Sequence, residues 1–301
     1  MTDASSNNPA HKGYPRSAAT VKREFQRILE QLAGHKRPYE IFRDWAEMAA
    51  ISVHQLPYHA GERPVDAVFE GLEQQFSERE QRYTPEERKT LSHLFALTME
   101  GLATPNDFLG ELYCELGFTN TNSGQFFTPY TVSRMIAHMQ MGNMEAIVRE
   151  KGVITVEDPA CGAGGMLVAA TEEALSQGLD PRQILQFYAT DIDRDCFNMT
   201  YLQLSLLEVQ GTVRHGNTLS QEIWETRDTP QMQFFKDWLK GRQAEERIRR
   251  MLDIMKGMDR PSDSTAATPE PEIPEQQPTP DIVFNPQQLS LFDWNELSQG
   301  L

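Results

Sequence analysis

Apolar residues in the N-terminal third of the chain recur every three or four positions, the spacing that places them on one face of an α-helix. The histidines in this part do not have the spacing of metal ligands, so we expect them to have structural or surface roles. The histidines are His54, His59 and His93, and nothing else in this part of the chain suggests a catalytic or binding role. The predicted helical segments are 21–32, 39–51, 64–76 and 91–102.

A helix start precedes the last of these segments. Thr84 has the character of an N-cap, Pro85 fits the first helical position, and two glutamates follow in the first turn. Together these patterns predict an all-helical module over residues 17–104. The polar residues before it, 1–16, are expected to be a disordered lead-in.

The pattern changes to alternating strands and helices in the middle of the chain. A β-branched run at 153–156 leads into a glycine-rich turn and then into a helical stretch, 166–177. Two more strand-like runs, 186–189 and 211–215, are separated by the helical stretch 196–209. This order predicts an α/β fold with a parallel, doubly wound sheet.

The charge of the chain limits how it could meet nucleic acid. Its 301 residues include 28 Lys+Arg against 44 Asp+Glu, a formal net charge of −16. A protein that holds nucleic acid by electrostatics alone needs clustered Lys and Arg, so this balance argues against that class. No window approaches the roughly eighteen apolar residues of a membrane-spanning helix. Residues 1–10 lack the apolar core of a signal peptide, so we expect a cytoplasmic protein without membrane contact.

The three cysteines are Cys114, Cys161 and Cys196, which are widely spaced and form no C-x-x-C pair. This arrangement indicates neither a disulfide framework nor a cysteine-rich zinc site. We expect reduced, unpaired thiols and no bound metal.

Residues 261–301 differ in composition from the rest of the chain. They hold seven acidic residues and no Lys or Arg, a formal charge of −7 that leaves −9 for the remainder. They also hold seven of the 18 prolines, and the run 262–280 has almost no apolar residue to bury. Such a segment cannot offset its ordering entropy, so we expect an acidic, disordered tail.

The glycine-rich turn and the acid after the second strand indicate a ligand site. Gly162, Gly164 and Gly165 lack a Cβ, so the backbone can approach a ligand at the strand ends where parallel sheets bind them. Asp191, at the end of the next strand, could accept hydrogen bonds from both hydroxyls of a ribose. The alternatives are a tight turn without ligand, and a helix N-cap at Asp191 or Asp193. Together the two features favour a nucleoside-containing cofactor.

Two motifs resemble those of a known family. The run Asp158–Gly165, D-P-A-C-G-A-G-G, is similar to the S-adenosylmethionine loop of DNA adenine-N6 methyltransferases, particularly the modification subunits of type I restriction systems. The run Gly124–Pro129 is similar to the G-Q-[FY]-[FY]-T-P element of that family, and the preceding Asp107–Tyr113 also fits. The resemblance covers about residues 105–220. It implies a truncated S-adenosylmethionine-dependent methyltransferase (Rossmann-like) sheet and S-adenosyl-L-methionine as the cofactor.

The resemblance also implies roles for residues of the glycine-rich turn. Gly162, Ala163 and Gly164 would approach the methionine moiety of the cofactor, with Asp158 at the floor of the pocket. Asp191 would hold the ribose.

Further residues would complete the pocket by the same resemblance. Phe127 and Thr128 would line it, although plain core packing is the alternative for Phe126 and Phe127. Asn217 stands where the family usually has an aspartate that accepts a hydrogen bond from the adenine amino group. Its side-chain carbonyl could still accept that bond.

The element that holds the target base is missing. The family stacks and bonds a flipped adenine with an [ND]-P-P-[FYW] motif at the end of the fourth strand, and no such motif occurs in this sequence. After Leu219 we find no buried strand where the fourth should follow, and a charged helical stretch, 231–258, comes next. The nearest candidate is the run Asp281–Gln288, in which a single proline follows Asn285. Asn285 is therefore the one candidate catalytic residue, and base chemistry is in doubt.

With three strands, the first would expose an unpaired edge, which another element or chain usually covers. A homodimer or the helix 231–258 could cover it. This helix also carries basic residues, for which a solvated face and a DNA-contacting role are the two interpretations. The basic residues are Arg242, Arg247, Arg249, Arg250 and Lys256.

A short apolar motif lies on the acidic tail, and it resembles the Q-L-[SD]-L-F peptide by which bacterial proteins dock on the DNA polymerase III sliding clamp. Its last two residues are paired apolar anchors, and its glutamine supplies directional hydrogen bonds. Clamp docking would raise the local concentration of the body near DNA without a basic surface. The alternative is that this end of the chain folds back on the body. The motif is Gln288-Leu289-Ser290-Leu291-Phe292.

The sequence therefore predicts an S-adenosylmethionine-binding DNA adenine-N6 methyltransferase-like protein that the sliding clamp recruits to DNA. Besides DNA and the clamp, a specificity subunit or a second copy is an expected partner. One alternative is a catalytically inactive adaptor that binds DNA, cofactor or a partner subunit, and another is methylation of a protein or small molecule. We expect a bacterial cytoplasmic protein, which a mobile element could encode. The expected divisions are the disordered lead-in 1–16, the helical module 17–104, the methyltransferase-like domain 105–230, the helical extension 231–260 and the acidic tail 261–301.

Overall fold

The computed structural model describes most of the chain up to the end of its last helix. The lead-in 1–15, Gly124 and the acidic tail 261–301 lie outside the described residues. The predictions for Asn285 and for the clamp motif 288–292 therefore have no structural counterpart. The described residues are 16–34, 36–119 and 125–258, with side chains as far as Met251.

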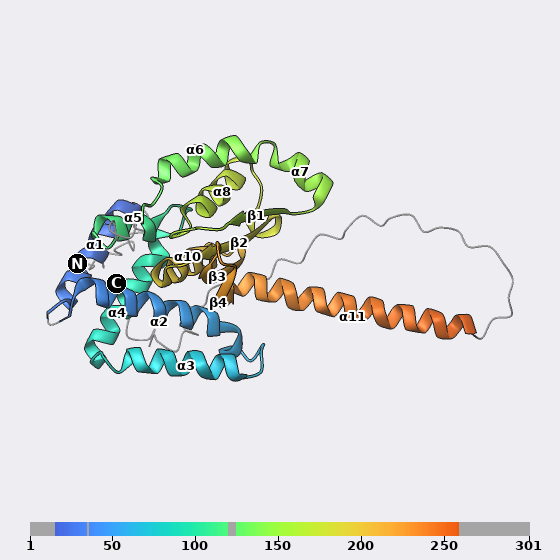
Figure 1. The fold of residues 1–301 in the computed structure, drawn as a ribbon, viewed down its shortest axis with the longest axis horizontal. Coiled ribbons are helices and arrows are strands. Elements are labelled where there is room, and N and C mark those ends of the chain that lie inside the picture. The colour runs from blue at the N-terminus through green and yellow to red at the C-terminus, as the bar shows by residue number, and fades with distance from the viewer. Residues whose placement is uncertain (1–15, 35, 120–124, 259–301) are drawn as a thin grey trace, which may run out of the picture.

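The N-terminal third is helical, as predicted, and Figure 1 shows its helices packed beside the sheet. The predicted start at Thr84 is a complete capping box. The Thr84 hydroxyl accepts a hydrogen bond from the Glu87 amide at 3.2 Å, and the Glu87 carboxylate accepts one from the Thr84 amide at 2.8 Å. The helices are α1 (Ala18–Leu32), α2 (Pro38–His59), α3 (Ala67–Glu80), α4 (Pro85–Gly101) and α5 (Phe108–Glu115).

The described strands form one four-stranded sheet in the order β1-β2-β3-β4. The first three are parallel, which confirms the predicted α/β fold. The fourth runs antiparallel to β3. The strands are β1 (Ile154–Asp158), β2 (Leu185–Asp191), β3 (Gln210–Asn217) and β4 (Glu222–Asp228).

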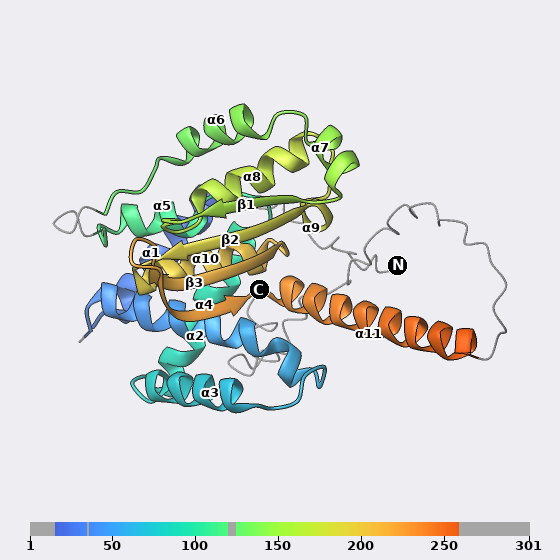
Figure 2. The ribbon, with the colours of Figure 1, turned by 45° about the vertical axis from the view of Figure 1, so that its right-hand side comes forward.

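The connecting helices α8 and α10 pack on one face of the sheet, because the parallel strands follow one another in a single direction. The prediction of a doubly wound sheet is therefore wrong for the described residues. Val156 lies opposite Phe187 in the β1–β2 pair, and Phe187 is fully buried on this face. The other face of β1 presents Thr155 and Glu157, which are exposed. Figure 2 shows α6 outside α8, at the β1 side of the sheet. These helices are α6 (Tyr130–Met141), α7 (Met144–Lys151), α8 (Gly165–Ser176), α9 (Pro181–Ile184), α10 (Arg194–Leu206) and α11 (Pro230–Met258).

The prediction of a sheet with three strands is wrong, because a fourth, mostly exposed strand follows Leu219. The chain turns back at once, with Gln221 at a φ of 59°, and β4 pairs with β3. The expected fourth strand was a buried, parallel one, which has a continuous apolar run. An antiparallel edge strand is exposed along one side and needs no such run, so its mixed sequence of glutamates, Ile223 and Trp224 gave no signal.

The free edge of β1 is present as predicted, because β1 pairs with β2 alone among the described strands. The suggestion that helix 231–258 covers this edge is wrong. That helix, α11, packs against β3, β4 and α2, at the opposite edge of the sheet.

The helical module and the sheet share one hydrophobic core. The cluster runs without a break from Phe25 and Trp45 in the helices to Phe187 and Val213 in the sheet. Helix α10 packs against α2 on one side and against β2 and β3 on the other, so it joins the two parts.

Candidate functional site

Three side chains stand at the carboxyl ends of the parallel strands. Asp158 ends β1, Asp191 ends β2 and Asn217 ends β3. The strands are in register and parallel, so these ends meet at one edge of the sheet. The turns after β1 and β3 are also joined directly, because the Thr218 hydroxyl donates a hydrogen bond to the Pro159 carbonyl at 2.6 Å.

The glycine-rich turn between β1 and α8 has the backbone that only glycine adopts easily. Gly162 has a φ of +54° and Gly164 a φ of +89°. The space beside these glycines is occupied by neighbouring side chains. A Cβ on Gly162 would lie 2.7 Å from the Phe127 ring, and one on Gly164 would lie 3.1 Å from the Thr200 hydroxyl. Glycine is therefore required here by the packing of the protein itself.

Asp191 is tied to this turn. One carboxylate oxygen accepts a hydrogen bond from the Gly162 amide at 2.8 Å, and the other accepts one from the Asp193 amide at 2.9 Å. Burial raises the pKa of the Asp191 carboxyl. Of the two residues considered as N-cap of α10, Asp193 has that role, since it accepts from the amides of Asp195 and Cys196. Each oxygen of Asp191 retains a lone pair for a further donor.

Phe126 and Phe127, the two aromatic residues of the upstream motif, have different surroundings. Phe126 is 78% exposed, whereas Phe127 packs partly against the core and meets the Tyr113 ring edge-on, with centroids 5.7 Å apart. Phe127 and the exposed Thr128 line a small cavity together with Asp158, Gly162 and Ala163. Its volume is about 70 Å³.

A second cavity, of about 400 Å³, lies on the other side of Phe127 and Thr128. Asp107 lines both cavities and is buried. Its carboxylate accepts hydrogen bonds from the Gly110 amide at 3.2 Å and from the Gln203 side chain at 2.9 Å, and burial raises its pKa.

Two residues of α10 that were not predicted from the sequence support the glycine-rich turn. Gln203 on α10 also donates to the Ala163 carbonyl at 2.7 Å, and the Thr200 hydroxyl donates to the Gly162 carbonyl at 2.8 Å. The spacing of Thr200 and Gln203 along one helix carries no signal of this contact. Asp107 was inside a motif already noted, and its place before an apolar helical run was the only clue to it.

Asn217 has a different partner from the one expected. Its side-chain carbonyl accepts hydrogen bonds from the amides of Leu219 at 3.0 Å and Ser220 at 3.3 Å. The carbonyl thus shapes the turn into β4, and the side-chain amide is the group left for a ligand.

The residues at this edge fit a nucleoside ligand in their chemistry. Asp191 offers carboxylate lone pairs, and Phe127 offers an apolar ring beside the turn. Binding pockets for ligands of this size have volumes of about 300–1,000 Å³, and the cavity of about 70 Å³ is smaller than this range. Phe127 also lines the adjoining cavity of about 400 Å³.

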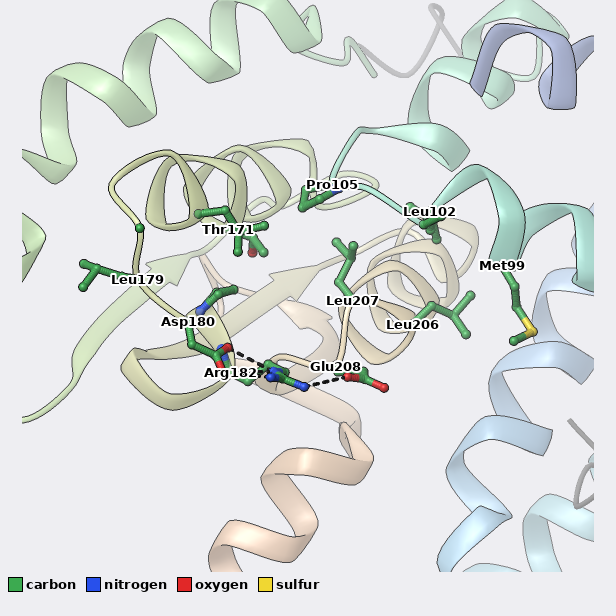
Figure 3. A pocket seen from close by; sticks show the side chains of 14 residues that line it. Met99, Leu102, Pro105, Thr171, Leu179, Asp180, Arg182, Leu206, Leu207 and Glu208 are labelled. Atoms are coloured by element: carbon green, nitrogen blue, oxygen red, sulfur yellow. Dashed lines mark hydrogen bonds and ion pairs between the residues drawn. The ribbon is translucent and has the colours of Figure 1, made fainter. Parts of the chain in front are cut away.

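A larger cavity, of about 730 Å³, lies at the opposite, amino end of the strands (Figure 3). It is lined mainly by apolar side chains of α4, α8 and α10. Its one arginine, Arg182, is held by Asp180 at 2.9 Å and by Glu208 at 3.3 Å. Its charged side chains pair with one another, whereas the carboxyl-end site combines the glycine-rich turn with Asp191, so the carboxyl-end site is the better candidate.

Neither metal nor disulfide chemistry is indicated in the part of the chain that the structure describes. No group of three His, Cys, Asp or Glu side chains there could hold a metal ion. Cys161 and Cys196 are buried free thiols, and Cys114 is an exposed one. None of the described helices combines the length and apolar character that crossing a membrane requires.

The segment that contains this site matches a known protein family. Residues 106–235 match the family model of the N-6 DNA Methylase domain. This segment holds Phe127, the turn at 158–165, Asp191 and Asn217. The match agrees with the predicted resemblance over this segment, which is less than half of the chain.

Individual relatives match over limited lengths. The methylase subunit of the type I restriction enzyme MjaIX from Methanocaldococcus jannaschii is 30% identical over 91 residues, which are 30% of this chain and 14% of that protein. The chain thus corresponds to a small part of that relative.

Two solved structures also match. The methyltransferase subunit of a type I restriction-modification system from Streptococcus thermophilus is 12% identical, with a TM-score of 0.37, 70% of this chain covered and 60% of that one. A Listeria monocytogenes protein, assigned to the class I S-adenosylmethionine-dependent methyltransferases, is 13% identical, with a TM-score of 0.29, 67% of this chain covered and 55% of that one. The fold assignment is based on the order and direction of the strands, and not on these two matches.

Proposed function

We propose that this chain binds S-adenosyl-L-methionine at the carboxyl ends of β1 and β2 and acts as an N6-adenine DNA methyltransferase-like protein. The observation that carries the proposal is the 2.8 Å hydrogen bond between the Gly162 amide and the Asp191 carboxylate. It joins the glycine-rich turn and the acid of the next strand into one rigid unit within the segment that matches the N-6 DNA Methylase family.

Each residue of the unit has a role in this proposal. Asp191 accepts hydrogen bonds from the ribose hydroxyls through its remaining lone pairs. The backbone of Gly162 and Gly164 lies against the methionine moiety, and Phe127 moves aside to admit the ligand and then packs on it. The cofactor, when bound, supplies a methyl group activated on a sulfonium.

Calorimetry tests the cofactor site directly. Wild-type chain titrated with S-adenosyl-L-methionine should release or absorb heat with a single saturable site, and Asp191→Asn should weaken binding by at least about tenfold, because a charge-assisted hydrogen bond is lost. Asp237→Asn, at an exposed site on α11, is the matched control and should bind like wild type. Absence of heat for the wild type at high cofactor concentration would rule out the site.

We further propose that Asn285 is a degenerate base-holding element for adenine. Its motif keeps the asparagine and one proline of the family pattern. The test is transfer of labelled methyl groups to adenine in unmethylated DNA, by wild type and by Asn285→Ala. Transfer that persists in the variant would leave Asn285 without this role.

A catalytically inactive adaptor is the second candidate. It is favoured by the lack of an [ND]-P-P-[FYW] motif anywhere in the sequence. It is also favoured by the path of the chain after Asn217, which returns as antiparallel β4 instead of extending the sheet beyond β1. Saturable cofactor binding without methyl transfer to any adenine-containing DNA would select the adaptor over the enzyme.

We also propose that the bacterial sliding clamp recruits this chain to DNA. The sequence Gln288–Phe292 is the only support for this part of the proposal. A chain of this acidity needs such help to stay near DNA. The double variant Leu291→Ala/Phe292→Ala should lose retention on immobilised clamp, because the two apolar anchors are removed. Leu297→Ala, on the same tail outside the motif, is the control. Equal retention of the double variant would discard clamp docking.

A further inference from the structure

Helix α11 leaves the body after its first turns. Met232 and Gln233 are buried, and the Lys236 ammonium bonds the Asp228 carboxylate at 2.6 Å, so this end is held on the sheet. Every residue from 239 to 251 is exposed. Figures 1 and 2 show the rest of the helix as a rod that projects away from the sheet and from the N-terminal helices.

A solvated helix of this kind lacks the usual source of helical stability. Helices in proteins are stabilised mostly by packing of an apolar face. The projecting part of α11 has such a face. Ile248 is 57% exposed and Met251 is 61% exposed.

Four apolar or small residues of the projecting part follow alternating steps of three and four, whereas Leu239 lies off this line. This is the a/d pattern of a coiled coil, with apolar side chains on a single seam. The described positions of the seam are Gly241, Ala244, Ile248 and Met251, and the sequence continues it at Met255 and Met258.

We propose that α11 forms a parallel, two-stranded coiled coil with α11 of a second copy of this chain. A seam of this kind is complementary to itself, and the helix stands clear of its own body, so two copies can approach along it. The small residues Gly241 and Ala244 lie nearest the body, where they let the helices come close before the larger Ile248 and Met251 interlock.

The charged flanks of the seam favour a second copy in the parallel orientation. In the heptad set by the seam, Lys240 occupies a g position and Glu245 the e position five residues on. A parallel pair brings g of one helix beside that e of its partner, so Lys240 meets Glu245 of the other copy, twice by symmetry. Within one chain, Lys240 reaches only the exposed Asp237 among its described ion-pair partners, at 3.2 Å. An antiparallel pair would lose both contacts.

The molar mass of the full-length chain tests the proposal, and it does not depend on the proposed function. Light scattering across a concentration series should show a shift from one chain to two. Ile248→Glu puts a charge into the seam of both helices and should weaken dimerisation by at least about a hundredfold. Gln243→Glu adds the same charge at an exposed position outside the seam and should dimerise like wild type.

Charge exchange and cross-linking test the orientation. Lys240→Glu and Glu245→Lys should each weaken the dimer, and the double variant should restore it, because the pairs re-form with exchanged signs. With Cys114→Ser as background, Met251→Cys should form a disulfide between copies on oxidation, since the two seam positions meet in a parallel pair. Arg249→Cys, away from the seam, should not.

Two results would overturn the proposal. One is a wild-type chain that stays a single-chain species at all concentrations, which would leave the α11 face to another protein. The other is a dimer that survives Ile248→Glu unchanged, which would place the contact elsewhere.

Discussion

Gly162 is the residue on which the candidate site is built, and its surroundings explain why no other residue fits. Its φ of +54° belongs to the left-handed region, and the Phe127 ring lies where a Cβ would be. The same glycine donates its amide hydrogen to Asp191. Backbone conformation, packing and the acid of the next strand therefore all depend on one position.

We predict that Gly162→Ala destabilises the chain more than Gly178→Ala. Both glycines have positive φ, but a Cβ on Gly178 meets nothing within 4 Å. Gly178→Ala should cost about 1 kcal/mol from backbone strain alone, and Gly162→Ala about 2–4 kcal/mol because Phe127 must also move. Urea unfolding of both variants measures the difference. Equal losses would mean that Phe127 does not pack on this glycine.

A second residue makes the stability depend on pH. His54 is buried between Tyr201 and Gln233, and burial lowers its pKa to about 4, below the ordinary value of 6.5. The native state therefore excludes a proton that the unfolded chain binds below about pH 6.5. The free energy of unfolding should fall by up to about 3 kcal/mol from this group as the pH drops from 6.5 to 4.

Urea unfolding at several pH values checks this prediction. His54→Gln should remove that part of the pH dependence, and His59→Gln, at an exposed site on the same helix, should leave it unchanged. Parallel pH profiles for wild type and His54→Gln would contradict it.

At the scale of elements, some helices and strands could be predicted from local sequence, whereas others depended on tertiary contacts. The start of α4 could be predicted from the sequence because a capping box involves residues only three positions apart. Strand β4 was not readable, because an edge strand with one exposed side has no continuous apolar run.

The capping box should contribute measurably to stability. Thr84→Ala removes the hydroxyl that accepts from the Glu87 amide and should cost about 1 kcal/mol. Thr90→Ala makes the same change inside the same helix, where alanine has the better helix propensity, so its effect should be near zero or slightly stabilising. Thermal unfolding of the two variants gives the comparison. Equal shifts in Tm would show that the cap is not the cause.

At the scale of the whole molecule, an ion-pair group links the helical module to the sheet. Arg194 on α10 reaches Glu47 on α2 at 3.1 Å and also pairs with Glu225 on β4. Glu225 in turn accepts from the buried Arg227 at 2.6 Å. With the continuous hydrophobic core, this group makes the two parts one folding unit.

We therefore predict a single cooperative unfolding transition for the described body. Far-ultraviolet circular dichroism and tryptophan fluorescence should give the same urea midpoint. Arg194→Met should lower the stability by about 1–3 kcal/mol, because Glu47 and Glu225 lose a partner in a partly buried setting. Arg149→Met breaks an exposed pair with Glu145 and should cost less than about 0.5 kcal/mol. Two separate transitions would contradict the single unit.

The site itself was predictable in part. The turn at 158–165, Asp191 and Phe127 are close together, as the resemblance implied, because strand ends in a parallel sheet converge. The hydrogen bonds of Asn217 and the support from Thr200 and Gln203 were not predictable, since they join residues whose proximity depends on how α10 packs.

The sequence by itself determined the helical N-terminal module, the three parallel strands with their connecting helices, and the glycine-rich turn, because these follow from periodicity, capping and backbone freedom within a few residues. Only the tertiary structure decided that Phe127 lies on Gly162, that Asp191 bonds the turn, that β4 extends the sheet beside β3, and that α11 stands away from the body. These features depend on contacts between segments far apart in the chain, and such contacts form only when the whole core packs.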